Sequence, residues 1–144
     1  MATVGHILAD KGGEVMKVSS QTTVMEASVK MNDKAIGALV VEEGDKVVGI
    51  FTERDVLRRV VVKGVKAEDV SVGDVMTGEV ICCKPDMDLE EARGICMKRR
   101  VRHLPVIDDE GRLHGLISIG DLNAWDLTGH KRTIHYLHEY LYGT

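Results

Sequence analysis

The stretch Gly49-Ile-Phe-Thr-Glu-Arg-Asp55-Val56 returns 66 residues later as Gly115-Leu-Ile-Ser-Ile-Gly-Asp121-Leu122. Both copies read as a glycine, two apolar residues, a hydroxyl residue, two variable residues, an aspartate and an apolar residue. Upstream, residues 36–41 match residues 101–106 at an offset of 65. The one-residue change in offset falls in charged stretches that read as hairpin turns, where an insertion costs little. An indel confined to turns indicates a duplicated unit.

Each copy predicts the same order of elements, β-α-β-β-α. A short apolar strand precedes an amphipathic helix, on which Val24, Ala27 and Met31 share one face in the first copy. Two strands joined by the charged turn follow, and then a closing helix. The matching helical face of the second copy comprises Leu89, Ala92 and Cys96. The predicted strands are residues 15–18, 37–41 and 47–51 in the first copy and residues 80–83, 103–107 and 113–117 in the second.

The composition fits a folded domain with an aliphatic core. Of 144 residues, 44% are hydrophobic and 29% are charged, which excludes a disordered chain that lacks apolar area to offset its ordering entropy. Only 3% are aromatic, so stacking on aromatic platforms is excluded as a main binding device. The formal charge of −4 argues against a nucleic-acid partner. No apolar run reaches the ~18–20 residues that cross a bilayer, so we expect no membrane partner.

The cysteines indicate a reducing compartment. There are three of them, none in a metal-like C-x-x-C pair, and the N-terminus lacks a signal-peptide pattern. We therefore expect a cytoplasmic protein. Cys82 and Cys83 read as structural thiols, because no activating base can be placed beside them. No phosphate-binding loop motif and no catalytic set is present, so we expect no enzymatic activity and no required cofactor.

The repeats divide the chain into three parts. Residues 1–64 hold the first copy with an N-terminal lead-in, residues 65–127 hold the second copy, and residues 128–144 form a tail. The linker is the polar stretch of residues 63–71. Residues 131–142 of the tail predict an amphipathic helix. Pro105 lies within a predicted strand, which indicates an edge or irregular position.

The repeated hydroxyl-x-x-Asp element has two interpretations. Thr52 and Ser118 fit the N-caps of helices, with Asp55 and Asp121 complementing the helix dipole in the first turn. Alternatively, a carboxylate beside a helix N-terminus accepts two hydrogen bonds from a ribose diol, while free amides there meet phosphate. The duplication favours the second interpretation.

These residues resemble a tandem pair of cystathionine-β-synthase (CBS) domains, a Bateman module. The resemblance covers residues 4–127, and its most specific parts are the doubled motif and the segment Val101-Arg-His-Leu-Pro-Val106. It implies an α+β fold of two repeats about a pseudo-twofold axis, followed here by the C-terminal helix. It also implies two clefts that bind AMP, ADP, ATP, NAD(H) or S-adenosylmethionine, a regulatory, energy-sensing role toward a partner protein, and a homodimer.

The resemblance also assigns residues to the two clefts. The first cleft is the better candidate for a phosphorylated ligand, because guanidinium groups suit phosphate geometry. The second has a thinner basic lining, so we expect it to hold a neutral adenosyl group or no ligand. The first cleft comprises Thr52, Arg54 and Asp55 with Ile81, Cys82, Arg102 and His103. The second comprises Ser118, Gly120 and Asp121 with Met16, Lys17, Ile36 and Gly37.

One alternative from another class stays open. The chain could be a structural dimerisation and interaction module whose nucleotide clefts are vestigial. In the basic run Lys98–Arg102, residues 98–100 read as a helix C-terminus whose charges offset the dipole, whereas Arg102 and the following His103 lie past the helix and are expected to contact phosphate. An RNA-binding surface would need more basic and aromatic residues. The three histidines of the tail are a weak metal signal, because no set of ligands accompanies them.

Overall fold

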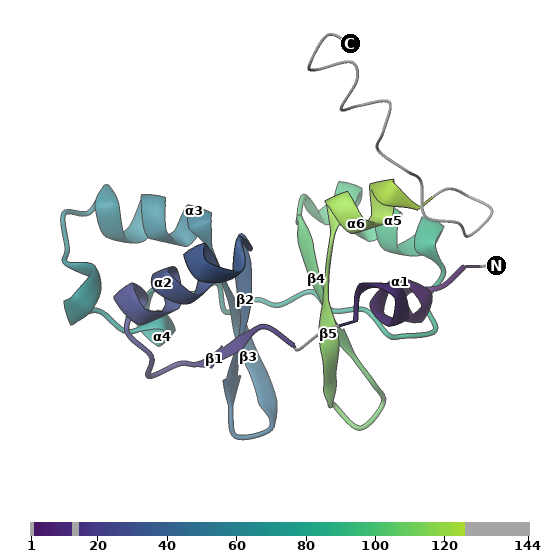
Figure 1. Ribbon diagram of the computed structural model, residues 1–144, viewed down its shortest axis with the longest axis horizontal. Helices are drawn as coiled ribbons and strands as arrows, with labels where there is room; N and C mark the ends of the chain where they lie inside the picture. Colours follow the sequence, from purple (N-terminus) through teal and green to yellow (C-terminus); the bar gives the residue numbers. More distant parts are fainter. Residues whose placement is uncertain (1, 13–14, 126–144) are drawn as a thin grey trace, which may run out of the picture.

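The computed structural model describes residues 2–12 and 15–125, which form the α+β fold that the sequence predicts (Figure 1). Two small sheets lie side by side in the middle of the molecule, and the helices lie on their outer sides. The helices are α1 (Val4–Lys11), α2 (Val24–Lys34), α3 (Glu53–Val56), α4 (Val72–Val75), α5 (Leu89–Arg99) and α6 (Ile119–Ala124), with a π-helical turn at Leu57–Val61 and a 3-10 turn at Ala67–Asp69. The strands are β1 (Lys17–Ser19), β2 (Ala38–Glu43), β3 (Lys46–Thr52), β4 (His103–Ile107) and β5 (Leu113–Ser118).

The first copy has the predicted order, β1-α2-β2-β3-α3. Strand β1 pairs parallel with β2, and β2 pairs antiparallel with β3. The predicted helical faces are confirmed in both copies, because the three residues of each face are 5% exposed or less. The sequence-predicted first strand starts two residues early, since pairing begins at Lys17. The predicted tail helix lies outside the described residues.

The second copy lacks the strand predicted at residues 80–83, and the position of one proline explains why. In the first copy the N–H of Val40 donates to the carbonyl of Met16 at 3.0 Å. The equivalent of Val40 in the second copy is Pro105, which has no N–H to give to Ile81. Pairing there is reduced to an isolated bridge between Cys83 and Val106. Pro105 thus lies on the edge of a two-stranded sheet, as predicted.

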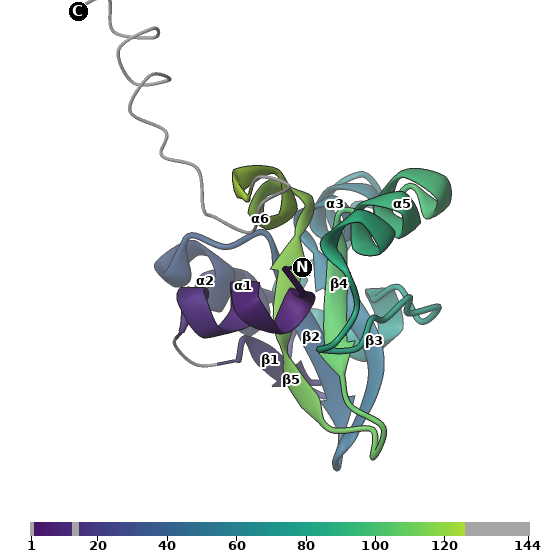
Figure 2. The same cartoon turned by 90° about the vertical axis from the view of Figure 1, so that its right-hand side faces the viewer.

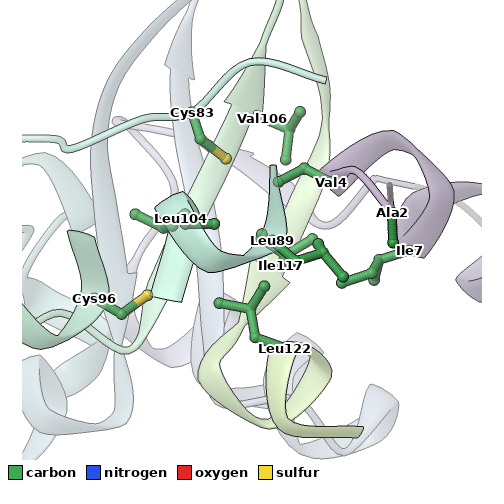
Figure 3. Packing of buried hydrophobic residues seen from close by; sticks show 11 residues of the cluster. Ala2, Val4, Ile7, Cys83, Leu89, Cys96, Leu104, Val106, Ile117 and Leu122 are labelled. Atoms are coloured by element: carbon green, nitrogen blue, oxygen red, sulfur yellow. The ribbon is translucent and has the colours of Figure 1, made fainter. Parts of the chain in front are cut away.

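Each lead-in helix packs against the opposite copy. Val4 and Ile7 of α1 are fully buried in the core of the second copy, where they join residues of α5, β4 and β5 (Figure 3). Figure 2 shows α1 beside β5. Conversely, Val72 and Val75 of α4 belong to the core of the first copy, around Phe51. The two cores therefore share chain segments, and residues of α1 reach the second copy's cleft.

The face of each sheet that points away from its own core lies at the boundary between the two copies. Side chains alternate across a strand, so Leu39 and Val41 of β2 enter the first core while Val40 between them points the other way. Val40 is nevertheless fully buried. Its equivalent Pro105 is buried too, outside the second core. The two sheets lie next to each other, between the helices of the two copies (Figure 1).

Candidate functional site

Two cavities of the described part are lined by residues of both copies. The first cleft, of about 280 Å³, lies between the β3–α3 junction and the segments 77–81 and 100–105. The second cleft, of about 530 Å³, lies between the β5–α6 junction, the end of α1 and the segment 35–38. Gly37 and His103 line both. These volumes are close to the ~300–1,000 Å³ typical of small-molecule sites.

The β3–α3 junction builds the first cleft. Thr52 caps α3: its hydroxyl accepts from the N–H of Asp55, and the Asp55 carboxylate accepts from the N–H of Thr52 at 3.0 Å. The other carboxylate oxygen accepts from the hydroxyl of Thr77 at 3.3 Å, and Arg59 lies 3.8 Å away. Asp55 is therefore held internally and does not line the cavity, whereas Thr52 and Thr77 do.

Cationic side chains surround the rest of the first cleft. Arg54 comes from α3, and Arg100 and Arg102 come from the loop between α5 and β4. Two carboxylates, Glu53 and Glu79, share the lining. The lining of the cleft thus includes several guanidinium groups, which suit an anionic ligand group.

The β5–α6 junction repeats the cap in the second cleft, with a different partner for its aspartate. Ser118 caps α6, and the Asp121 carboxylate accepts from the Ser118 N–H at 2.8 Å. Lys11, the last residue of α1, places its Nζ 2.9 Å from the same carboxylate oxygen and 3.0 Å from the carbonyl of Leu116. Both Lys11 and Asp121 line the cavity.

Burial sets the protonation of two groups near the clefts. Desolvation lowers the pKa of His103, with Arg102 and Lys11 acting in the same direction and Asp121 and Glu53 opposing them. A neutral imidazole thus stands between the clefts. Burial, together with the nearby thiols of Cys82 and Cys96, raises the pKa of Cys83 to about 12. A thiol held in its protonated form is a poor nucleophile, in line with the structural role predicted for this pair.

The structure brings most of the predicted residues to the clefts. Four predicted residues do not line them: Asp55 and Cys82 in the first cleft, and Lys17 and Gly120 in the second. Lys17 instead pairs with Glu42 at 3.1 Å. The residues that line the first cleft as predicted are Thr52, Arg54, Ile81, Arg102 and His103. Those that line the second are Met16, Ile36, Gly37, Ser118 and Asp121.

Sequence reasoning missed Lys11, Thr77 and Arg100. Arg100 belongs to the basic run that was read as a helix C-terminus. Lys11 and Thr77 come from the lead-in segments, whose weak similarity gives no sign that each crosses to the other copy. The second cleft therefore has one lysine, as predicted, but it is Lys11 of α1 and not Lys17.

Metal and membrane signals are absent from the described ranges. Residues 2–12 and 15–125 contain no cluster of three or more His, Cys, Asp or Glu side chains fit to hold a metal ion. None of their helices combines the length and the apolar character that spanning a membrane requires. The tail histidines lie outside these ranges.

The doubled junction and the two shared clefts match a known family. The family model of the CBS domain matches residues 4–62 and 72–127. The chain belongs to the CBS-domain family. A CBS-domain protein of Burkholderia ambifaria is 38% identical, with a TM-score of 0.82 over 92% of this chain and 99% of that one. The resemblance drawn from the doubled motif is thereby confirmed.

Relatives differ in what accompanies the CBS pair. The mitochondrial CBS domain-containing protein CBSX3 of Arabidopsis thaliana is 33% identical over 98% of this chain and 72% of its own length. Inosine-5'-monophosphate dehydrogenase of Methanocaldococcus jannaschii is 42% identical over 76% of this chain but only 21% of the enzyme. A more distant structure that shares the fold is PAE2072 of Pyrobaculum aerophilum complexed with AMP, at 19% identity and a TM-score of 0.73 over 83% of this chain and 88% of that one.

Proposed function

We propose that this CBS pair is a regulatory module that binds an adenosine nucleotide (AMP, ADP, ATP or NAD(H)) in the clefts between its copies and acts in trans on a partner protein. The observation that carries the proposal is the pair of capped helix junctions, each opening on a cavity that both copies line. A ligand in such a cavity touches both copies at once. Binding therefore biases how the copies pack, which a partner protein can read.

In the first cleft the phosphate of the ligand lies toward the arginine side chains of the lining. Arg54, Arg102 and His103 meet the phosphate, and Thr52 with Asp55 takes the ribose diol once Thr77 yields its hydrogen bond. Adenine lies on the aliphatic surface around Ile81. Pro105 cannot donate to the Ile81 carbonyl, so that carbonyl stays available to the exocyclic amine of adenine.

The AMP complex of PAE2072 supports the class of ligand. That protein shares the fold at low identity, so the choice among adenosine nucleotides rests on the residues of this chain. Its several guanidinium groups in the first cleft favour a phosphorylated ligand over a neutral one.

Isothermal titration of the full chain with AMP, ATP, NADH and S-adenosylmethionine tests the proposal. We expect at least one ligand to bind below millimolar, and Arg102→Ala to weaken AMP about tenfold or more, since a charged hydrogen bond contributes ~1.5–3 kcal/mol. Adenosine binding should change little, because it has no phosphate. Arg112→Ala, in the exposed turn between β4 and β5, is the matched control. Absence of binding by all four ligands would refute the proposal.

A second candidate is a homodimeric interaction module, favoured by apolar residues beside α3. Leu57, Val61 and Val62 are 55%, 62% and 70% exposed, and the first two are one helical turn apart. We expect them to bury against a second copy of the chain. Light scattering should find a dimer that Val61→Glu converts to a monomer, whereas Met97→Glu, at a site 78% exposed on α5, leaves it intact. A monomeric unsubstituted chain contradicts this candidate.

The compartment is also a proposal. The free, half-buried or buried thiols of Cys82, Cys83 and Cys96 fit a reducing environment, and we propose the cytoplasm. The mitochondrion, which the name of CBSX3 gives for that relative, is the competing compartment.

A further inference from the structure

In the second cleft a lysine side chain makes the two contacts that a threonine makes in the first. In the first cleft Thr77 serves two partners: its backbone N–H donates to the carbonyl of Ile50 at 2.9 Å, and its hydroxyl donates to Asp55. The equivalent of Ile50 in the second copy is Leu116. There a single ammonium group does both tasks, because Nζ of Lys11 donates to the Leu116 carbonyl and to Asp121.

Lys11 can leave this position at low cost. Its side chain is 42% exposed and that of Asp121 is 24% exposed, so water screens the ion pair. Nζ of Lys11 and the N–H of Ser118 both contact Oδ2 of Asp121. A ribose diol that engages both carboxylate oxygens therefore competes with Nζ for Oδ2. A neutral nucleoside bound in this way displaces Lys11 and offers it no charged partner in return.

A displaced Lys11 has no second carboxylate among the described residues that line the cavity. In that part of the lining Asp121 is the only acidic side chain, and Lys11 is the only lysine or arginine. An anionic group on the ligand restores a partner to the ammonium group. The charge balance of the cleft thus depends on what the ligand itself carries.

We propose that Lys11 is the specificity-determining residue of the second cleft, which it makes selective for ribosyl ligands that bear an anionic group, such as a nucleoside monophosphate, over neutral nucleosides. This inference rests on the proposed function, because it assigns a ligand class to one of the two clefts. It gives α1, which belongs to the lead-in of the first copy, a role in ligand choice at the second.

Titration of the full chain with AMP and adenosine tests the inference. The second-cleft component of binding is defined as the component that Asp121→Asn removes; the substitution keeps the side-chain volume and an oxygen that can accept from Ser118. In the unsubstituted chain we expect this component to prefer AMP over adenosine. In Lys11→Met, which keeps the aliphatic stem but not the charge, we expect the preference to fall about tenfold, with adenosine binding more tightly. Lys11→Arg should retain the preference.

The outcomes separate this inference from the proposed function. A ratio of AMP to adenosine affinity that Lys11→Met leaves unchanged overturns the role of Lys11. So does a titration in which Asp121→Asn removes no component while Arg102→Ala still weakens AMP, and in that case the nucleotide function stands through the first cleft alone. If neither nucleotide nor nucleoside binds anywhere, both proposals fail. Thermal unfolding of each variant identifies a loss of binding that comes from misfolding.

Discussion

The motif aspartate of the first cleft, Asp55, is 7% exposed, whereas its equivalent in the second cleft, Asp121, is 24% exposed. Asp55 accepts from a backbone N–H and the hydroxyl of Thr77, and Arg59 lies 3.8 Å from it. Asp121 accepts from a backbone N–H and from the ammonium group of Lys11. The same four-residue cap is thus a buried structural element in one copy and a solvent-screened ion pair in the other.

This difference separates the two interpretations of the motif. Both copies cap a helix, so capping is what the repeated sequence specifies directly. What else each aspartate can do depends on the lead-in segment that reaches it, since Thr77 follows α4 and Lys11 ends α1. The duplicated unit therefore gives both clefts the same capped helix junction. The segments outside the shared motif supply different partners for the two aspartates, so the clefts differ in charge and exposure.

The largest expected contrast is in the stability of the two aspartate variants. Asp55→Ala leaves the backbone N–H of Thr52 and the half-buried hydroxyl of Thr77 without their acceptor, which should lower the free energy of unfolding by about 2–3 kcal/mol. Asp121→Ala removes a cap whose partner Lys11 can turn to water, which should cost about 1 kcal/mol. Urea unfolding followed by circular dichroism measures both.

Asp55→Asn and Asp121→Asn are the matched controls, because each keeps one oxygen that accepts from the cap. We expect Asn to recover part of the loss at position 55 and most of it at position 121. Equal losses for the two alanine variants would contradict the contrast between a buried and a screened carboxylate.

Local patterns predicted most of the fold. The spacing of Val24, Ala27 and Met31 identified a buried helical face, and the hydroxyl residues Thr52 and Ser118 are the N-caps that they were predicted to be. These features depend on residues within one or two helical turns, so a single sequence contains them. The duplication then supplied the family and most residues of both clefts.

What the sequence did not show depends on contacts between distant segments. The strand predicted at residues 80–83 does not form because Pro105 occupies the position whose N–H would donate to the Ile81 carbonyl, and only the register of the folded sheet defines that position. Lys11 reaches Asp121 across 110 residues because α1 packs on the opposite copy. No periodicity or motif in residues 4–11 signals that crossing.

The smallest expected effect concerns His103, which lines both clefts, as Gly37 does. Its equivalent in the first copy is Ala38, so the imidazole has no counterpart across the boundary between the copies. Burial lowers the pKa of His103 in the folded chain. The positive charges of Arg102 and Lys11 lower it further, and the negative charges of Asp121 and Glu53 raise it in part. In the unfolded chain the imidazole titrates near its ordinary value of about 6.5.

The unfolded chain therefore binds more protons at this site as the pH falls below about 7, and the free energy of unfolding should fall with it. The contribution of a neutral His103 is fully present above that pH and is lost as the pH drops through the lowered pKa. His103→Gln keeps a polar side chain that cannot titrate, so the difference in stability between the unsubstituted chain and this variant should shift in favour of the variant from pH 7.5 to pH 5. Urea unfolding at a series of pH values measures that difference. If the difference stays constant over the range, burial does not lower the pKa of His103. A shift in favour of the unsubstituted chain would mean that the folded chain binds a proton at His103 more readily than the unfolded chain does, which contradicts a neutral imidazole between the clefts.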